Sequence, residues 1–599
     1  MDGFPILSTI AYLPLLGALA IFFIPRVSQD TSRRIALGAS ALTFVVSLLL
    51  LFRFDRNAEF QFQETVSWLP GLGVSYALGV DGIAVLLIAL TTLLSLIAII
   101  WSWDTVNKRT PEYYIALLLL ETGMLGVFMA LDLFIFYIFW ELMLIPMALL
   151  IGVWGSTNRV YAAVKFFLYT LFGSLLMLVA IVATYQSYFN DTGIRTLNVL
   201  ELQNGDYGRT FQFWVFAAFF AAFAVKVPMF PFHTWLPDAH VEAPTAASVI
   251  LAAVMLKMGG YGLLRFNLPL YEQAARDWAP AIVVLSIIGI LYGALVALVQ
   301  PDMKKLIAYS SVSHMGFVTL GIFVFNLQGL DGAMMVMLAH GFNTGGLFLL
   351  VGVIYERAHT RQISAFGGLA TRMPAFSAYF ALFMFASIGL PGLSGFVGEF
   401  LVALGTWEYN PVAAVFTFAV VIFAAWYMMW MFQRVVFGRA PGELPDPHDN
   451  ALTTDERDAL PKERPVGADQ THGDPHGHGA APVHGHATAF TGRPPTASSL
   501  PEHVVPYPVS GGSQDHPAMP NAPAGPEPVP AVAAKPDATS DVHAHAPAEV
   551  HSEVWPDLTR KEALTLFPLA VLTIVTGIYP APILKICEPA FERILAPFI

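Results

Sequence analysis

A single stretch, "AFAVKVPMFPFHTWLPDAH" at residues 222–240, decides how this chain is built. It is apolar and aromatic, yet it carries Lys226 and then interrupts its own helix with Pro228 and Pro231. Proline removes a backbone donor and frees carbonyl groups, and at membrane depth such groups are tolerated only where they line a cavity or are covered by protein. The stretch therefore predicts a broken membrane helix with room for water beside a buried lysine.

The composition around this stretch is that of a membrane protein. Of the 599 residues, 56% are hydrophobic and only 12% are charged. Apolar runs near the roughly 20 residues needed to cross about 30 Å of hydrocarbon recur from residue 5 onwards. We therefore predict an all-α polytopic membrane protein with about fourteen transmembrane helices. The predicted helices cover residues 5–24, 34–53, 80–103, 112–130, 132–154, 160–185, 211–232, 244–265, 279–299, 304–325, 331–356, 374–404, 411–434 and 562–584.

A different kind of sequence fills residues 438–560. This segment holds 17 acidic and 7 basic residues, so it carries −10 of the net charge of −12, and it also holds 21 of the 42 prolines and 11 of the 16 histidines. Because it cannot bury enough apolar surface to offset its conformational entropy, we predict a mostly irregular insertion. Its histidines could belong to a solvated low-complexity linker, or they could bind Zn²⁺ or Ni²⁺. The segment could also be a strap, an extended stretch that lies on neighbouring subunits. Since no cysteine or fixed histidine pair shapes a site, we predict no specific metal role.

The basic residues of the short loops predict the orientation of the chain. Thirteen lysines and arginines follow odd-numbered predicted helices, and six follow even-numbered ones. Loops rich in basic residues stay in the cytoplasm. We therefore expect the odd-numbered loops and the insertion to be cytoplasmic and both termini to be periplasmic.

Ionisable side chains recur inside the predicted helices. Each one costs about 2.5 to 3.5 kcal/mol on insertion scales, so each needs a partner, water or a function. A structural ion pair would explain two of them, whereas a proton pathway needs a chain of titratable groups. We therefore predict proton conduction. The residues of this series, which occupy six helices, are Glu141, Lys226, Lys257, His314, His340 and Glu399, with Glu121 and Lys165 as further charged groups.

Individual residues of the series leave other interpretations open. Glu141 and Lys226 could form a static salt bridge that fixes helix packing. His314 could be a hydrogen-bonded packing residue, whereas His340 in "MLAHGFNTGG" has small and polar neighbours that leave room for water. Two more histidines follow the second helix break and are interpreted as mouth or capping residues, His233 and His240.

A second broken helix is predicted in "ASIGLPGLSGFVGEF", where Gly389, Pro391 and Gly392 precede Glu399. Breaks thus stand beside ionisable residues in predicted helices seven and twelve. Such a matched pair is the sequence signature of a transporter built from inverted repeats, and we predict two inverted five-helix repeats, helices four to eight and nine to thirteen. The predicted domains are 1–111 for helices one to three, 112–265 for the first repeat, 279–437 for the second, 438–560 for the insertion, and 561–599 for the last helix and the C-terminal tail.

Four long motifs resemble the proton-translocating antiporter-like family: "IFWELMLIPM", "KVPMFPFHTWLPDAHVEAPTAASVILAAVMLKMGGYGLLRF", "IAYSSVSHMGF" and "GLPGLSGFVGEF". The resemblance covers about residues 1–437 and 558–599 and is closest to the subunit M branch of NADH:quinone oxidoreductase, respiratory complex I. Glu399 favours this branch over the sister subunits L and N, since these are expected to have lysine at this position. The insertion departs from the family, which usually joins helices thirteen and fourteen by a short loop.

This resemblance implies a non-redox subunit of a proton-translocating enzyme. The resemblance implies that the Glu141 and Lys226 pair starts a half-channel, that Lys257 lies at the centre, that His340 and its neighbours continue the path, and that Glu399 lies in the exit half-channel. It implies no cofactor or metal in this chain, with NADH, FMN, Fe–S clusters and quinone in other subunits. The implied partners are the other membrane-arm subunits, L and N among them, and lipid, but no nucleic acid; the implied location is the bacterial inner membrane.

Two other functions remain to be weighed against this one. The chain could be a subunit of a multisubunit cation/proton antiporter or of a membrane-bound hydrogenase, since these complexes use the same family. It could also be a stand-alone secondary transporter, but a transporter gathers its charges at one midplane pocket, and here they are spread over six helices.

Overall fold

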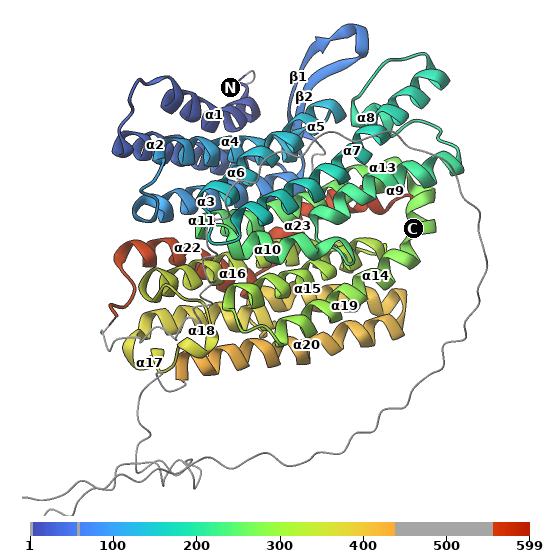
Figure 1. The fold of residues 1–599 in the computed structure, drawn as a ribbon. Coiled ribbons are helices and arrows are strands. Elements are labelled where there is room, and N and C mark those ends of the chain that lie inside the picture. Colours follow the sequence, from blue (N-terminus) through green and yellow to red (C-terminus); the bar gives the residue numbers. More distant parts are fainter. Residues whose placement is uncertain (1–3, 57–59, 438–554) are drawn as a thin grey trace, which may run out of the picture. The chain divides into compact units, whose positions relative to one another are not determined.

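The chain is almost entirely helical in the computed structural model, which describes residues 4–56, 60–437 and 555–599 (Figure 1). Twelve helices in these ranges are long and apolar enough to cross a membrane. The two remaining predicted helices, 211–232 and 374–404, are interrupted, as their prolines and glycines predict. The all-α polytopic prediction is therefore confirmed. The predicted insertion lies, up to residue 554, outside the described residues.

The N-terminal helices pack closely on one another. They are α1 (Ile6–Phe23), α2 (Gln29–Arg53), α3 (Gly82–Thr105) and α4 (Thr110–Met129). Helix α1 packs against α2 and α4, and α2 packs against α3. Small residues allow this approach: a Cβ atom on Gly17 would lie 2.6 Å from the Cβ of Ala39.

A β-hairpin between α2 and α3 departs from the all-helical prediction. Strand β1 (Gln61–Leu69) pairs antiparallel with β2 (Val74–Val80) through the 3₁₀ turn η1 (Pro70–Leu72). The turn ends at Gly73, whose φ of +70° lies in the left-handed region that favours glycine. The proline and glycine of this turn and the β-branched residues around it are the local signals for the hairpin.

Helix α4 and the helices that follow it cover the first predicted repeat, 112–265, whose symmetry stays a prediction. The elements after α4 are α5 (Leu133–Leu142), α6 (Leu144–Trp154), α7 (Arg159–Thr192), α8 (Val199–Leu202), α9 (Arg209–Lys226), the 3₁₀ turn η2 (Phe232–Thr234), α10 (Trp235–Glu242), α11 (Thr245–Ile250), the π-helical turn η3 (Leu251–Met255), α12 (Leu256–Gly262), the π-helical turn η4 (Leu263–Asn267) and α13 (Leu268–Leu270). Segments α11 to α13 run on without a break, so predicted helix eight is one rod with two wide turns.

The later helices carry the second predicted repeat and the C-terminal region. They are α14 (Glu272–Leu298), α15 (Met303–Phe323), α16 (Leu327–Ala358), the 3₁₀ turn η5 (Ile363–Ala365), α17 (Leu369–Arg372), α18 (Pro374–Ile388), α19 (Ser394–Tyr409), α20 (Pro411–Phe432), the π-helical turn η6 (Gln433–Phe437), α22 (Arg560–Ile578) and α23 (Ala581–Leu595). The predicted end of the last membrane helix at residue 584 is wrong: α22 ends at Ile578, and Pro580 precedes the separate helix α23.

Three segments form the centre of the described bundle. The most apolar windows of Thr245–Leu270 and Leu327–Ala358 are completely buried by protein, and that of Met303–Phe323 is 94% buried. A membrane helix that is shielded from lipid on all sides can carry ionisable groups without exposing them to hydrocarbon. These three segments hold Lys257, His340 and His314.

Candidate functional site

The carboxylates and lysines of the predicted series stand beside local departures from the α-helix. Glu141 lies two residues before the interruption at Met143, and Lys226 is the last residue of α9. Lys257 follows the π-helical turn η3. Glu399 lies in the second turn of α19, after a break at which Gly389 and Gly392 have φ values of +85° and +92°. Each side chain thus lies next to backbone N–H or C=O groups that lack their regular α-helical hydrogen-bond partner.

Lys257 and His340 are in direct contact at the centre of the bundle. The Nζ atom of Lys257 lies 2.8 Å from Nδ1 of His340 and donates to the carbonyl oxygen of Ala252, in the π-helical turn, at 2.5 Å. A protonated lysine has no acceptor, so Nδ1 of His340 must then accept and the proton of a neutral ring sits on Nε2. That Nε2 atom is buried and has no hydrogen-bond partner among the described residues.

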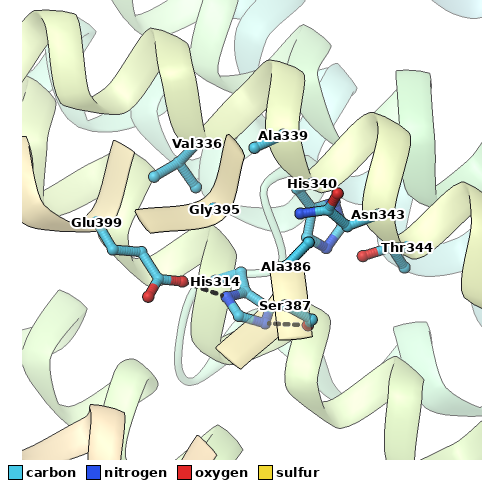
Figure 2. Close-up of a pocket in the computed structure, with 10 residues that line it drawn as sticks. All are labelled: His314, Val336, Ala339, His340, Asn343, Thr344, Ala386, Ser387, Gly395 and Glu399. Carbon is cyan, nitrogen blue, oxygen red and sulfur yellow. Dashed lines mark hydrogen bonds and ion pairs between the residues drawn. The ribbon is translucent and has the colours of Figure 1, made fainter. Parts of the chain in front are cut away.

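His314 and Glu399 form the second contact. Nδ1 of His314 lies 2.8 Å from Oε1 of Glu399, and Nε2 lies 3.2 Å from the hydroxyl oxygen of Ser387 (Figure 2). Both partners are buried. His314 therefore contacts the carboxylate from the broken helix, and its part in proton transfer stays a prediction.

A small cavity joins the two pairs. His314 and His340 both line it, and their ring centroids are 5.8 Å apart (Figure 2). The space open to the centre of a water molecule is about 10 Å³, close to the ~10–15 Å³ by the same measure that one buried water needs. The remaining lining residues come from α16 and from both sides of the break between α18 and α19: Val336, Ala339, Asn343, Thr344, Ala386, Ser387, Gly395 and Glu399. The break predicted from sequence thus borders a space for about one water.

Glu141 and Lys226 are neighbours but not a salt bridge. The ion pairs between described residues, with N–O distances up to 4.0 Å, do not include them. The ammonium of Lys226 lies over the rings of Trp140 and Phe166, 5.1 and 5.8 Å from their centroids. Oε1 of Glu141 is buried without a partner among the described residues. The static salt bridge considered from sequence is therefore absent from this conformation.

The first helix break is covered by protein. The indole N–H of Trp235 donates to the carbonyl oxygen of Val225 at 2.9 Å, which satisfies a group that the end of α9 leaves open. The two breaks thus differ: a tryptophan fills this one beside Lys226, whereas the break before Glu399 borders a cavity.

Three ionisable residues that the sequence placed at a channel mouth or in loops, His240, Lys304 and Arg265, are buried. His240 is completely buried, stacks on Phe348 at a centroid distance of 4.8 Å, and has no partner for either ring nitrogen among the described residues. Lys304 and Arg265 were counted as loop charges, but both are buried inside helical segments. Without them, the loop count is twelve basic residues against five, so the predicted orientation is unchanged.

Arg265 belongs to a buried ion pair with Asp81. Their Nη2 and Oδ2 atoms are 2.6 Å apart, and the side chains are 7% and 1% exposed. The hydroxyl of Tyr261 accepts from Nε of Arg265 at 3.1 Å and donates to the carbonyl oxygen of Phe128 at 3.0 Å. Asp81 also caps α3 by accepting the N–H of Ala84 at 3.0 Å. This pair ties the segment that bears Lys257 to the start of α3.

Comparison with known proteins gives a consistent set of relatives. A family model described as the transmembrane region of NADH:quinone oxidoreductase and Mrp antiporters matches residues 130–424. The chain is 53% identical over 448 residues to NADH-quinone oxidoreductase subunit M of Rhodobacter capsulatus, covering 72% of this chain and 86% of the relative. It is similar to a chain in the structure of respiratory complex I from Thermus thermophilus with bound NADH, with a TM-score of 0.67, 33% identity, and coverage of 73% of this chain and 90% of that one. A chain of the Mrp complex from Dietzia sp. DQ12-45-1b is 25% identical, with a TM-score of 0.63 and coverage of 72% of this chain and 47% of that one.

Proposed function

The chain belongs to the family of NADH-quinone oxidoreductase subunit M, and on this basis we propose that it moves protons between Lys257 and Glu399 through His340 and His314. It is a membrane-arm, proton-pumping subunit of respiratory complex I. The Mrp antiporter alternative is not favoured, because identity to the Mrp chain is 25%, against 53% to the subunit M relative. A membrane-bound hydrogenase subunit and a stand-alone transporter are likewise not favoured.

One observation carries the proposed path: two contacting pairs are separated by a single small cavity. A protonated Lys257 donates its proton to Nδ1 of His340, and the ring releases its other proton from Nε2 into the cavity. A water there passes a proton to the His314 and Glu399 pair, whose members are 2.8 Å apart. Each donor loses one proton and each acceptor gains one, which leaves the remaining proton of His340 on Nδ1. The cycle closes when the His314 and Glu399 pair releases its proton, the ring of His340 returns to the tautomer with its proton on Nε2, and Lys257 is reprotonated.

Glu141 and Lys226 act on this path through their charges. Since they are not bonded to each other, a change in the protonation of Glu141 alters the field at Lys226 without breaking a salt bridge. Lys226 is held over aromatic rings, which stabilise a cation but accept no proton. This pair therefore acts as a gate at the start of the path.

The subunit itself does no redox chemistry in this proposal. Its one cysteine, Cys587, is buried, so the chain does not supply the thiolates of a cluster. NADH, FMN, Fe–S clusters and quinone are bound by other subunits. The neighbours in the membrane arm include the sister subunits L and N, in the bacterial inner membrane, with both termini on the periplasmic side.

The test is to replace Glu399 in the complex and to measure proton pumping in proteoliposomes together with quinone reduction. Glu399→Gln removes the titratable group, and Glu399→Asp keeps it. We expect the Gln variant to lose pumping and the Asp variant to retain part of it. The matched control is Glu408→Gln, an exposed carboxylate on the same helix. Equal pumping by the Gln and Asp variants would reduce Glu399 to a packing residue.

A further inference from the structure

A wide cleft opens on the face of the bundle that the charge rule predicts to be cytoplasmic. Its volume is about 960 Å³. The segments that line it are the five loops after predicted helices three, five, seven, nine and eleven, with the helix ends beside them: residues 105–109 and 113, 153–156 and 159, 242–246, 304, and 351–361 in part. None of these residues lines the small cavity between His340 and Glu399.

Lys304 is the buried lysine of this cleft. It lies in the first turn of α15, is 5% exposed, and donates from Nζ to the carbonyl oxygen of Ala243 at 2.6 Å. Ala243 joins α10 to α11. The ammonium is therefore held against the backbone that follows the broken helix, and Lys304 at the same time lines a space large enough for many waters.

The carboxylates near Lys304 are engaged elsewhere. Oδ2 of Asp302 pairs with Nε of Arg361 at 3.1 Å. Oε2 of Glu242 accepts the hydroxyl of Ser156 at 2.6 Å and the N–H of Asn158 at 2.8 Å. Lys304 itself is in no ion pair among the described residues.

The lack of an ion pair matters for what Lys304 can do. A lysine that is not paired with a carboxylate can release its proton without stranding a counter-charge. Lys304 thus differs from Arg361, which also lines the cleft but is fixed by Asp302 and is always charged.

The next titratable group inward is His240. It lies three residues before Ala243, which accepts the hydrogen bond from Lys304, and the hydroxyl of Ser248 lies 3.0 and 3.4 Å from the carbonyl oxygens of His240 and Ala243. Its two ring nitrogens have no partner among the described residues, so one is free to accept a proton while the other releases one.

We propose that this cleft is the proton-uptake mouth of the subunit and that Lys304 takes protons from its water and passes them inward toward His240. The inference rests on the proposed function. The amine of Lys304 gains a proton from the cleft water, becomes an ammonium, and returns to the amine when it donates inward, so no other reactant is needed.

The experiment replaces Lys304 by cysteine in the assembled complex and restores a cation by chemical modification. The Lys304→Cys variant should pump at least roughly tenfold more slowly, because positioned proton-transfer groups contribute about 10²- to 10⁴-fold. Aminoethyl methanethiosulfonate leaves a primary ammonium on the cysteine and should restore most of the pumping. The trimethylammonium reagent leaves a positive charge that holds no transferable proton, and it should not restore pumping.

The matched control is Lys305→Cys, treated with the same reagents. Lys305 is the next residue of α15 and does not line the cleft. This variant should pump at the wild-type rate before and after modification.

Two results would overturn the inference. Restoration by both reagents would show that only the charge matters. Wild-type pumping by Lys304→Cys, in a series where Glu399→Gln fails, would remove Lys304 from the path while leaving the proposed function intact. If Glu399→Gln also pumps normally, the proposed function itself fails, and the inference with it.

Discussion

Replacing Asp81 by asparagine should destabilise the bundle strongly, because it leaves the guanidinium of Arg265 buried without its counter-charge. Asparagine keeps the oxygen that caps α3, so the change isolates the ion pair. Breaking a buried pair by removing one partner costs about 3 to 5 kcal/mol, and both side chains here are at most 7% exposed. Since about 1.4 kcal/mol is a factor of ten, the ratio of folded to unfolded protein should fall by roughly 10²- to 10⁴-fold.

The assay is the half-life of the assembled complex in detergent at a fixed elevated temperature, followed by native electrophoresis. The control is Asp277→Asn, which breaks the ion pair with Arg209 at the surface. The side chain of Arg209 is 72% exposed and that of Asp277 is 28% exposed. Exposed pairs contribute little to stability because water and salt screen them, so this half-life should stay close to that of the wild type. The double variant Asp81→Asn with Arg265→Met should recover most of the loss. A double variant no more stable than Asp81→Asn alone would refute the stranded-charge reasoning.

Three further predictions concern the proton path and the insertion. Lys226→Ala and Glu141→Ala should each leave the complex assembled but strongly reduce pumping in proteoliposomes; near-wild-type pumping in both would remove the gate. Ala339→Val should add two methyl groups to a cavity of about 10 Å³, displace the water and slow pumping, at about 1 to 3 kcal/mol of overpacking; wild-type pumping by a folded variant would show that no water is needed there. Removal of residues 445–550 should leave assembly, pumping and metal content unchanged, whereas loss of assembly alone would favour a strap, and loss of metal together with activity would overturn the prediction of no metal role.

The interrupted helices could be predicted because their cause is local. Pro228 and Pro231 remove donors, and Gly389 and Gly392 supply left-handed backbone, so sequence alone locates both breaks. The β-hairpin was missed because nearly every other apolar run on this chain is a helix, and its turn signal was not weighed against that pattern.

The contacts of the site could not be predicted in the same way. The pairing of Lys257 with His340 joins residues 83 positions apart and depends on how two buried helices face each other. The sequence brought Glu141 and Lys226 together as a pair, but the aromatic rings around Lys226 hold its ammonium without an ion pair. Lys304 and Arg265 were assigned to loops because a charged side chain near a helix end was expected to be exposed to solvent. Lys304 instead lies in the buried first turn of α15, and Arg265 lies in a buried π-helical turn.

The two π-helical turns in Thr245–Leu270 make this segment unusually sensitive to changes in chain length. A π-helical turn accommodates about one residue more than an α-helical turn, so each amounts to a retained single-residue insertion. Deleting one residue within Leu251–Met255 would allow a regular α-helix to form and would turn Lys257 by about 100° relative to the preceding residues. The lysine would keep its identity and depth but lose its histidine. A deletion of one residue in this stretch should therefore be as damaging as loss of Lys257 itself. When this segment is superposed on a regular α-helix, the residue correspondence shifts by one position at each π-helical turn.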